Sequence, residues 1–510
     1  MRMDAVSTMN SIARKIITPG GALPIRATLS ILLISALTGC SILRPIGPDY
    51  AAPEFPPPDE WQADLAKGLV EGEAPLQSWW QVFDDPALTA LITRTGAGNR
   101  DLKIAAARIE EARAARGISR SAWFPSIDGN GAVAGTRLSE ATTPTLPTGI
   151  DREETRYEVG LNAGWEIDVW GRVRRLVEAS SAEYQASIED YRDTLVLLYA
   201  EVALAYADVR TLQTRIQFAK DNLQRQQDTL SLTRIRFDAG LVPELDVYQA
   251  QLNISRTEAA LPLLQTQLIR AINRLGVLIG DGPQAVQDLL ATPASMLQPP
   301  DQILVGIPAN IIRQRPDIRR AERQLAAQTA RIGVARADLY PQFTLFGDFA
   351  FESLDSGDLF ESDNLAYGFG PSFRWNLFSA GRVRSLIDAQ EARAQQALHA
   401  YEQTVLRSME EVENAMSGYA QESRRHESLV KAVEAAKKAV ELVQALYRSG
   451  LTDFQNVLNM EQALTVQQDD LASSHGNQAG QLIRLYKALG GGWNADDITM
   501  AAPAEKEEIR

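Results

Sequence analysis

The sequence has very little cysteine and histidine, and it has no long apolar run. Cys40 is the only cysteine in 510 residues, so the chain cannot form an internal disulfide. The three histidines are scattered over helical stretches and do not form a zinc-binding pattern. No stretch of about 18 apolar residues is present, which excludes a membrane-spanning helix. No phosphate loop, nucleophile constellation or metal cluster appears, so we expect neither an enzyme nor a cofactor.

The charge pattern also excludes some classes of protein. The net charge is −14 and there is no basic block, which argues against a nucleic-acid partner. Charged residues make up 23% of the chain, too many for a bundle of membrane helices.

The beginning of the sequence is typical of a secretory signal. Arg14, Lys15 and Arg26 precede the short apolar run ATLSILLISALT (27–38). Leu-Thr-Gly then leads directly to Cys40, and this spacing resembles a bacterial lipobox, in which the thiol is lipidated. The alternative is an ordinary buried, inert cysteine. Because Ser41 rather than aspartate follows, we expect sorting to the outer membrane.

The chain repeats itself over long distances. The motif AARGISRSAWFPSI (114–127) returns as ARIGVARADLYPQF (330–343), and RFDAGLVPELDV (236–247) returns as LYRSGLTDFQNV (446–457). Each half therefore reads as helix, strand, strand, long helix, turn, helix, which predicts a pseudo-symmetric protomer.

Each half contains strand-like alternation. In YEVGLNAGWEIDV (157–169), apolar and aromatic residues alternate with polar residues and glycine, and the second half has a similar stretch from Tyr367. Phe346 breaks this pattern in the strand that precedes the second stretch. A soluble sandwich shows the same alternation, but strands of ten or more residues in an exported chain favour a transmembrane β-barrel.

The number of strands predicts an assembly. Four strands cannot close a barrel, and lipid does not tolerate an open edge. Two chains would give eight strands around a filled interior, whereas three would give twelve strands around a lumen. The smallest assembly with a pore is therefore a homotrimer.

Two stretches predict very long helices. From about Arg172 to Phe237, and again from Val383 to Tyr447, there is no proline and almost no glycine. Some 65 helical residues would extend for roughly 100 Å. Gly240 and Gly450 follow these stretches and suit the left-handed conformation that ends a helix. A soluble, rod-like coiled coil without a pore is the alternative, but it explains neither the strands nor the signal.

The repeats and motifs together resemble the TolC-type outer-membrane efflux channel family, in its lipoprotein (NodT-like) branch. The segments GPDYAAP (47–53), WWQVFDDPALTALI (79–92) and IIRQRPDIRRAERQLAAQTARIGVARADLYP (311–341) carry the resemblance. It implies a mixed α and β membrane protein: a trimeric twelve-stranded barrel, four strands per chain, continued by a periplasmic α-helical barrel with an equatorial belt. It also implies passive export of small molecules received from a periplasmic adaptor and an inner-membrane pump. The alternative on the same scaffold is a conduit for type I protein secretion.

The resemblance also assigns roles to the two turns, as adaptor-contacting tips and a periplasmic gate. The residues implied at the tips are Gly240, Leu241, Val242, Asp246, Gly450, Leu451 and Thr452. Asn456 and Asn459 stand where relatives often place the aspartates that constrict the mouth, so a ring of amides is expected here.

The expected organisation has five parts. They are a signal peptide (1–39), a lipidated strap (40–74), a first repeat (75–300; strands about 126–136 and 157–170, tip near 240), a second repeat (301–492; strands about 342–352 and 366–378, tip near 450) and a disordered tail (493–510).

Replacing Cys40 with serine should abolish lipid labelling, because the acceptor thiol is removed. Metabolic labelling with a radioactive fatty acid measures this, and labelling of the serine variant at the wild-type level would refute the anchor.

Overall fold

The computed structural model describes residues 44–53, 61, 68–72, 76–145, 151–306, 314–495 and 497. The signal segment and Cys40 lie outside the described residues, as does most of the tail. The chain divides into two compact units. Among the described residues, the first unit comprises 44–47, Pro125–Arg174 and Arg336–Phe378, and the second comprises the rest.

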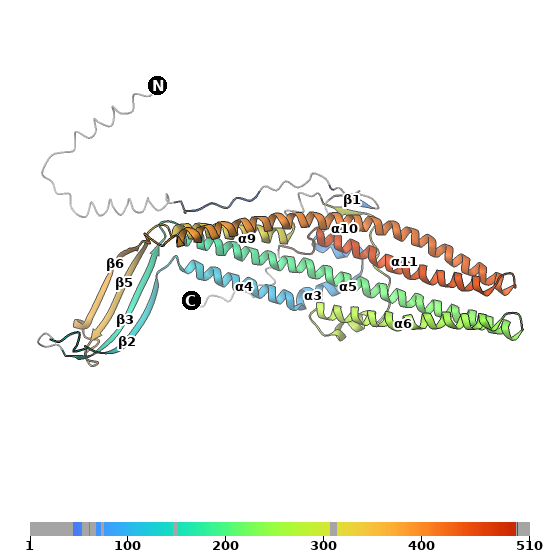
Figure 1. The fold of residues 1–510 in the computed structure, drawn as a ribbon, viewed down its shortest axis with the longest axis horizontal. Helices are drawn as coiled ribbons and strands as arrows, with labels where there is room; N and C mark the ends of the chain where they lie inside the picture. The colour runs from blue at the N-terminus through green and yellow to red at the C-terminus, as the bar shows by residue number, and fades with distance from the viewer. Residues whose placement is uncertain are drawn as a thin grey trace, which may run out of the picture. The chain divides into compact units, whose positions relative to one another are not determined.

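The first unit is built on a four-stranded antiparallel sheet, which confirms the four strands expected per chain. The strands are β2 (Ser126–Arg137), β3 (Glu153–Ile167), β5 (Gln342–Ser353) and β6 (Leu365–Arg374), in the order β2-β3-β5-β6 (Figure 1). A short 3-10 helix, η3 (Ser362–Asn364), precedes β6. Within this sheet, β2 and β6 each pair with one strand only, so each leaves one edge of backbone groups without a partner strand.

The strand limits differ in places from the sequence pattern. Strand β3 begins at Glu153 rather than near 157 and ends at Ile167, and β6 ends at Arg374 rather than near 378. The glycine-rich β2 has a low intrinsic strand preference, but it pairs with β3 from Ser126 to Arg137. Cross-strand pairing overrides its low intrinsic strand preference.

The two faces of the sheet carry different side chains. The register places Trp165 beside Leu345 and Phe343 beside Phe373 on one face. On the other face, Asn162 lies beside Asp348. The apolar face is exposed in the single chain; its exposed large side chains are Ile127, Val133, Val159, Leu161, Trp165, Leu345, Phe349, Tyr367, Phe369 and Phe373. Such a face suits lipid, with the polar face inward.

A left-handed glycine stands between the last strand of each half and its long helix. Gly171 has φ +83°, and a Cβ there would lie 2.6 Å from Cα of Pro45, so only glycine fits. Gly381 has φ +86° and open space around it. In the first half, the Asp168 carboxylate accepts hydrogen bonds from the backbone N–H groups of Val173 and Arg174 and caps the helix.

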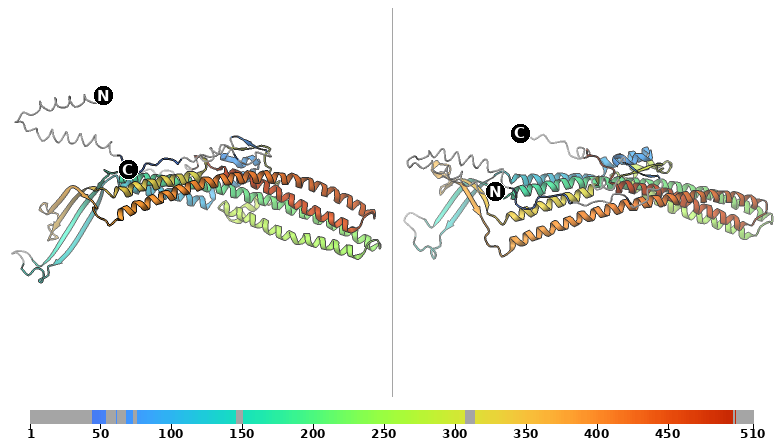
Figure 2. Two further views of the ribbon diagram at one scale, coloured as in Figure 1. Left: turned by 45° about the horizontal axis from the view of Figure 1, so that its top comes forward. Right: turned by 90° about the horizontal axis from the view of Figure 1, so that it is seen from above.

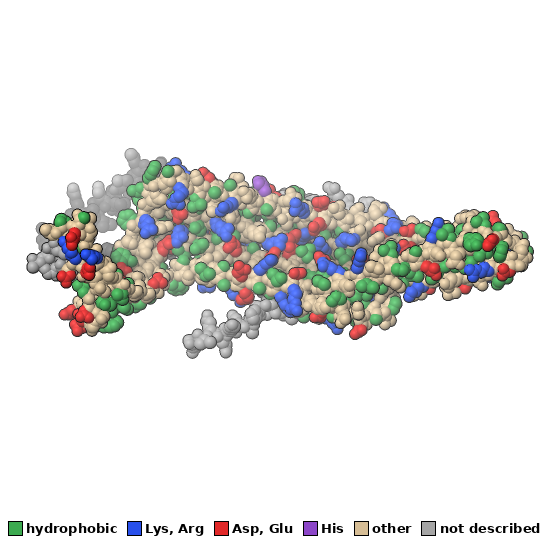
Figure 3. Space-filling model, turned by 60° about the horizontal axis from the view of Figure 1, so that its bottom comes forward, with side chains coloured by type: hydrophobic (Ala, Val, Ile, Leu, Met, Phe, Trp, Pro, Cys, Tyr) green, Lys and Arg blue, Asp and Glu red, His purple; other side chains and the backbone are tan. Residues whose placement is uncertain are grey.

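The second unit consists of helices whose lengths match between the two halves. They are α4 (Arg100–Ser121) and α9 (Pro316–Ala337), of 22 residues each; α5 (Arg172–Asp238) and α10 (Arg382–Arg448), of 67; and α6 (Glu244–Leu278) and α11 (Phe454–Ala488), of 35. Figures 1 and 2 show α6 running back beside α5, and α11 beside α10, as two hairpins. Acidic and basic side chains are interspersed along the face shown in Figure 3. Within the described residues, none of the helices is both long enough and apolar enough to cross a bilayer.

Short elements form a packed cluster against these helices. They are β1 (Leu69–Glu71), η1 (Leu76–Phe83), α3 (Pro86–Gly98), η2 (Pro283–Val286), α7 (Gln287–Leu290) and β4 (Ile303–Val305), with β1 and β4 paired in parallel. Trp79 is fully buried and stacks on Tyr486 of α11, with ring centroids 5.6 Å apart. The backbone N–H of Gly492 donates to the carbonyl of Leu76 at 2.8 Å. Residues distant in the sequence thus meet in one core.

The two hairpins approach each other closely where α5 passes α11. A Cβ added at Gly476 would lie 2.9 Å from Cγ2 and 3.0 Å from Cβ of Thr211. The next strong contact is an ion pair in which Arg215 donates two hydrogen bonds to Asp469, at 2.7 and 3.0 Å. Gly476 therefore sets the distance between the hairpins.

Gly476→Ala should destabilise the helical unit by about 1–3 kcal/mol, the usual cost of overpacking. Thermal denaturation of the purified protein measures the change. Adding Thr211→Ala should recover part of the loss, since it removes Oγ1 and Cγ2. Gly117→Ala in α4 is the matched control: its Cβ would meet nothing within 4 Å, so stability should stay the same or rise slightly. Equal effects at positions 476 and 117 would contradict the close approach.

Candidate functional site: the helix tips and the polar face of the sheet

The two helical hairpins end in turns of the same geometry. Gly240 and Gly450 have φ +72° and +74°. The N–H of Leu241 donates to the carbonyl of Arg236, and the N–H of Leu451 donates to that of Leu446, each at 2.9 Å. Both are Schellman-type helix ends, in which a left-handed glycine lets the chain satisfy the last carbonyls.

Each turn exposes one leucine at its tip. Leu241 is 66% exposed and Leu451 is 74% exposed. Val242 instead packs against the buried cluster inside the hairpins, beside residues such as Tyr447 and Phe454. The turns therefore combine a rigid apolar interior with a solvent-facing leucine.

Arg236 joins the two turns. Its Nη1 donates to the carbonyls of Tyr447 at 2.6 Å and Arg448 at 3.2 Å, at the C-terminal end of α10. Its guanidinium also lies 4.7 Å from the centroid of the Tyr447 ring. A positive charge at the end of a helix is favourable because it satisfies free carbonyls and opposes the helix dipole. The repeat aligns Arg236 with Leu446, so this link is formed only once per chain.

A buried carboxylate adds a second link between the hairpins. Glu461 of α11 accepts hydrogen bonds from Thr229 of α5 at 2.5 Å and from Gln444 of α10 at 3.1 Å. Burial raises the pKa of Glu461. Glu461 does not occupy either of the predicted gate positions, Asn456 and Asn459. The structure shows that its side chain is buried between the hairpins, which the spacing of residues in the sequence did not indicate.

The first turns of α6 and α11 carry a carboxylate and an amide at equivalent repeat positions, Asp246 and Asn456. Burial, and then the nearby charge of Asp453, raise the pKa of Asp246. Asp453 itself caps α11 by accepting a hydrogen bond from the N–H of Asn456 at 3.0 Å. Asn456 Nδ2 in turn donates to Oγ1 of Thr452 at 3.0 Å.

Asn456 and Asn459 are exposed and three residues apart, so they lie on the same face of α11. Asn459 accepts a hydrogen bond from Gln455 at 2.9 Å. Phe454 and Val457 are buried on the other side of the helix. The amides thus point away from the hairpin core, and their role at a constriction stays a prediction.

Two acidic residues near the end of β3 serve local structure. Glu166 forms an ion pair with Arg172. Asp168 caps α5 and also accepts a hydrogen bond from Arg174 Nε at 3.0 Å. On the polar face, Asn130 donates to Glu158 at 2.9 Å.

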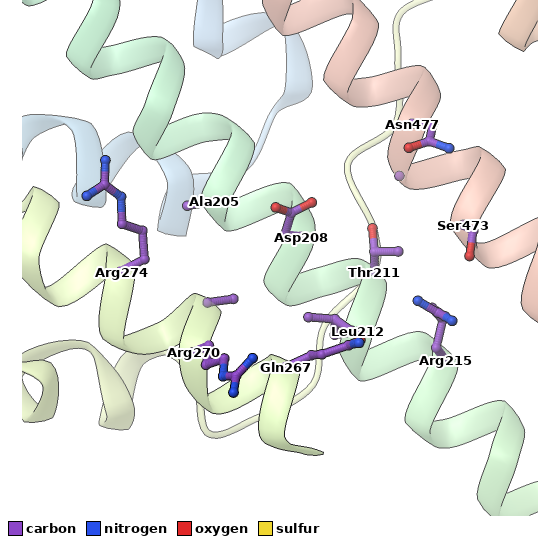
Figure 4. Close-up of a pocket in the computed structure, with 12 residues that line it drawn as sticks. Ala205, Asp208, Thr211, Leu212, Arg215, Gln267, Arg270, Arg274, Ser473 and Asn477 are labelled. Carbon is purple, nitrogen blue, oxygen red and sulfur yellow. The ribbon is translucent and has the colours of Figure 1, made fainter. Parts of the chain in front are cut away.

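A groove in the helical unit has the character of a helix-packing surface. It has a volume of about 480 Å³ and lies between α5, α6 and α11 (Figure 4). Two of its arginines are paired, Arg215 with Asp469 and Arg274 with Glu201.

His426 and His475 contact each other edge to face, with ring centroids 5.2 Å apart. Burial lowers the pKa of both imidazoles. Nε2 of His475 lies 3.0 Å from the carbonyl of Leu297, which fixes its ring. Among the residues that the structure describes, no group of three or more His, Cys, Asp or Glu has a metal-binding arrangement.

A sheet with two open edges and two long helical hairpins define a class of protein: a channel-forming outer-membrane protein that is completed by other copies of its chain.

The comparisons identify the family within that class. The outer membrane efflux protein family model matches residues 91–281 and 307–491. The solvent efflux pump outer membrane protein SrpC of Pseudomonas putida is 30% identical over 471 residues, covering 92% of this chain and 98% of its own length. Nodulation protein T of Rhizobium leguminosarum bv. trifolii is 30% identical over 469 residues, covering 90% and 96%. The chain belongs to the outer membrane efflux protein family, as its resemblance to TolC-type channels indicated.

Solved structures agree with this assignment. The outer-membrane channel OprN has 34% identity and a TM-score of 0.81, covering 88% of this chain and 99% of its own. CusC has 26% identity and a TM-score of 0.75, covering 88% and 100%. The predicted fold class is confirmed: a trimeric β-barrel with four strands per chain and an α-helical barrel. The protein is an outer-membrane channel component of an efflux system in a Gram-negative bacterium.

Arg236→Met should loosen the contact between the hairpins and increase the leak through the helical end of the channel. It removes a charged hydrogen-bond donor worth about 1.5–3 kcal/mol. Single-channel conductance in planar bilayers and uptake of a large hydrophilic antibiotic measure the leak. Arg234→Met, two residues away on an exposed position, is the matched control and should behave as wild type. A leak that is equal in the two variants would rule out the Arg236 link as a constraint.

Proposed function

We propose that the protein is the exit channel of a three-part pump that exports small apolar toxic compounds. It acts as a homotrimer, anchored through Cys40, and conducts passively. Energy comes from an inner-membrane pump through a periplasmic adaptor. The names of the relatives support this substrate class, since they describe pumps for solvents, toluene and antibiotics.

The observation that carries the proposal is the matched pair of tips. Two turns of the same backbone geometry each project an exposed leucine, Leu241 and Leu451, from a rigid apolar cluster. An exposed leucine on a preorganised turn can insert into a pocket of a partner at little entropic cost. Two such turns per chain give six docking positions in a trimer, which suits a ring-shaped adaptor assembly. Gly240 and Gly450 hold the backbone, Val242 packs beneath the first turn, and Asp246 and Thr452 complete the surface.

Opening follows from adaptor binding. The links through Arg236 and Glu461 favour hairpins held against each other. An adaptor that binds better to separated hairpins shifts the population toward the open mouth, by as much as its affinities for the two states differ. The exposed amides of Asn456 and Asn459 then line the mouth without the cation attraction of a carboxylate ring.

Leu241→Asp with Leu451→Asp should abolish adaptor docking, because both apolar contacts become charged. Complementation of a deletion strain measures this: the double variant should leave the strain about as susceptible to apolar toxic compounds as the deletion itself. Leu354→Asp, also at an exposed leucine but in the β5–β6 loop, is the matched control and should restore resistance.

The deletion strain by itself tests the substrate class. Increased susceptibility to small apolar compounds, with an unchanged secreted-protein profile, supports small-molecule export. Loss of a secreted protein with unchanged susceptibility would favour the type I secretion alternative.

A further inference from the structure

Phe346 stands on the wrong face of the sheet for an aromatic residue. In β5, Thr344, Asp348 and Glu352 point to the polar face, and Phe346 lies in the same row because side chains alternate along a strand. The apolar face of the same strand carries Phe343, Leu345, Gly347, Phe349 and Phe351. A barrel with lipid outside and water inside would ordinarily place a polar side chain at position 346.

Both neighbours of Phe346 across the sheet are glycines. The register pairs it with Gly164 of β3 and with Gly370 of β6. A Cβ added at Gly370 would lie 3.8 Å from Cε1 and Cζ of the ring, so the ring extends over that glycine. Because neither partner has a side chain, neither covers the outer surface of the ring, and Phe346 is 40% exposed.

The rows on either side are polar. One contains Asp128, Asn162 and Asp348 at a single level, and the other contains Glu166, Thr344 and Ser372. Phe346 is therefore an isolated apolar spot between two hydrophilic bands.

Assembly does not change this setting. Strand β5 already has a neighbour on each side within its own chain, so the strands of other subunits join at β2 and β6 and leave the level of Phe346 open. In a trimer, the three copies are four strands apart, roughly 20–25 Å along the tilted wall. The three rings are too far apart to touch as a plug, so they are separate contact points.

An aromatic side chain over a glycine also stabilises a sheet, and this is the alternative role for Phe346. That role needs only the contact with Gly370, and it is satisfied equally well on the lipid face. It does not account for an exposed ring between two bands of carboxylates and hydroxyls.

We propose that Phe346 is a binding subsite in the channel lumen for apolar aromatic compounds in transit. It rests on the proposed function, because it needs the trimer and its lumen. A weak apolar contact lets a sparingly soluble compound leave the water at one point of the wall and be released again. Transit requires binding of this kind, which is strong enough for entry and weak enough for exit.

The first test asks which medium the ring faces. If the Cys40 thiol is lipidated, Phe346→Cys introduces the only free thiol, and Phe349→Cys on the opposite face is the matched control. A membrane-impermeant thiol reagent applied to intact cells should label position 346 at least about tenfold faster, because a reactive thiolate forms only in contact with water. Protection is measured with Gly370→Cys, which keeps the Phe346 ring and places the thiol beside it, since a Cβ at position 370 would lie 3.8 Å from that ring. Adding p-xylene should slow labelling at 370, whereas glucose should not. Equal labelling rates at positions 346 and 349, or no protection of position 370 by p-xylene, would overturn the proposal.

The second test measures transport. Phe346→Thr, which restores the polar pattern of Thr344, should lower resistance to apolar aromatic compounds by about two- to tenfold, the range expected for one aromatic contact. Resistance to polar compounds exported by the same pump should be unchanged, and Phe346→Leu should fall between. The amount of trimer in the outer membrane is measured for each variant. An equal loss for both compound classes would show a purely structural role and overturn the subsite.

The two proposals fail in distinguishable ways. If deletion of the gene leaves susceptibility to every compound unchanged, the proposed function is wrong, and p-xylene protection of the purified Gly370→Cys variant, which retains Phe346, still decides the subsite. If deletion sensitises the strain while Phe346→Thr has no effect, the function stands and the subsite is wrong.

Discussion

The constraint on which this structure depends is that backbone hydrogen-bonding groups must find partners within lipid. The sheet of one chain leaves the edges of β2 and β6 open, and an unpaired edge in a bilayer costs several kcal/mol per backbone group. The solution is closure with other copies of the same chain, so folding and assembly of the barrel are a single process. The exposed aromatic face has a separate cause in the same environment, because apolar side chains are favourable where lipid surrounds the barrel.

The helical unit is stabilised in a different way from the sheet. It has ordinary water around it, and its long helices are stabilised by contacts between hairpins instead of by closure of a sheet. Close approach at Gly476, the Arg215–Asp469 pair and the buried Glu461 occur successively along α11. Burying a carboxylate is costly, and the raised pKa of Glu461 expresses that cost. Polar links of this kind favour one arrangement of the hairpins because their hydrogen bonds require specific partners.

The two halves match in the lengths of their main helices, and they differ in individual side chains at the tips. Helix lengths match pairwise between the halves, and both hairpins end in the same left-handed turn. At the level of side chains, Arg236 corresponds to Leu446, and Asp246 corresponds to Asn456. Duplication supplies a symmetric scaffold. Residues that differ between the two copies provide the link between the tips, and they give the first turns of α6 and α11 different charges.

The class of fold, the long helices, the turns and the need for other subunits could all be predicted from the sequence. These features depend on local patterns: period-two alternation, the absence of proline over long stretches, and glycine after a helix. The side-chain contacts, in contrast, follow from how the whole chain packs. That Glu461 is buried against Thr229, that Arg236 caps the other hairpin, and that Phe346 lies between Gly164 and Gly370 all depend on strand register and on helix contacts between residues far apart in the chain. No local pattern encodes such distances, because they arise from packing of the whole chain.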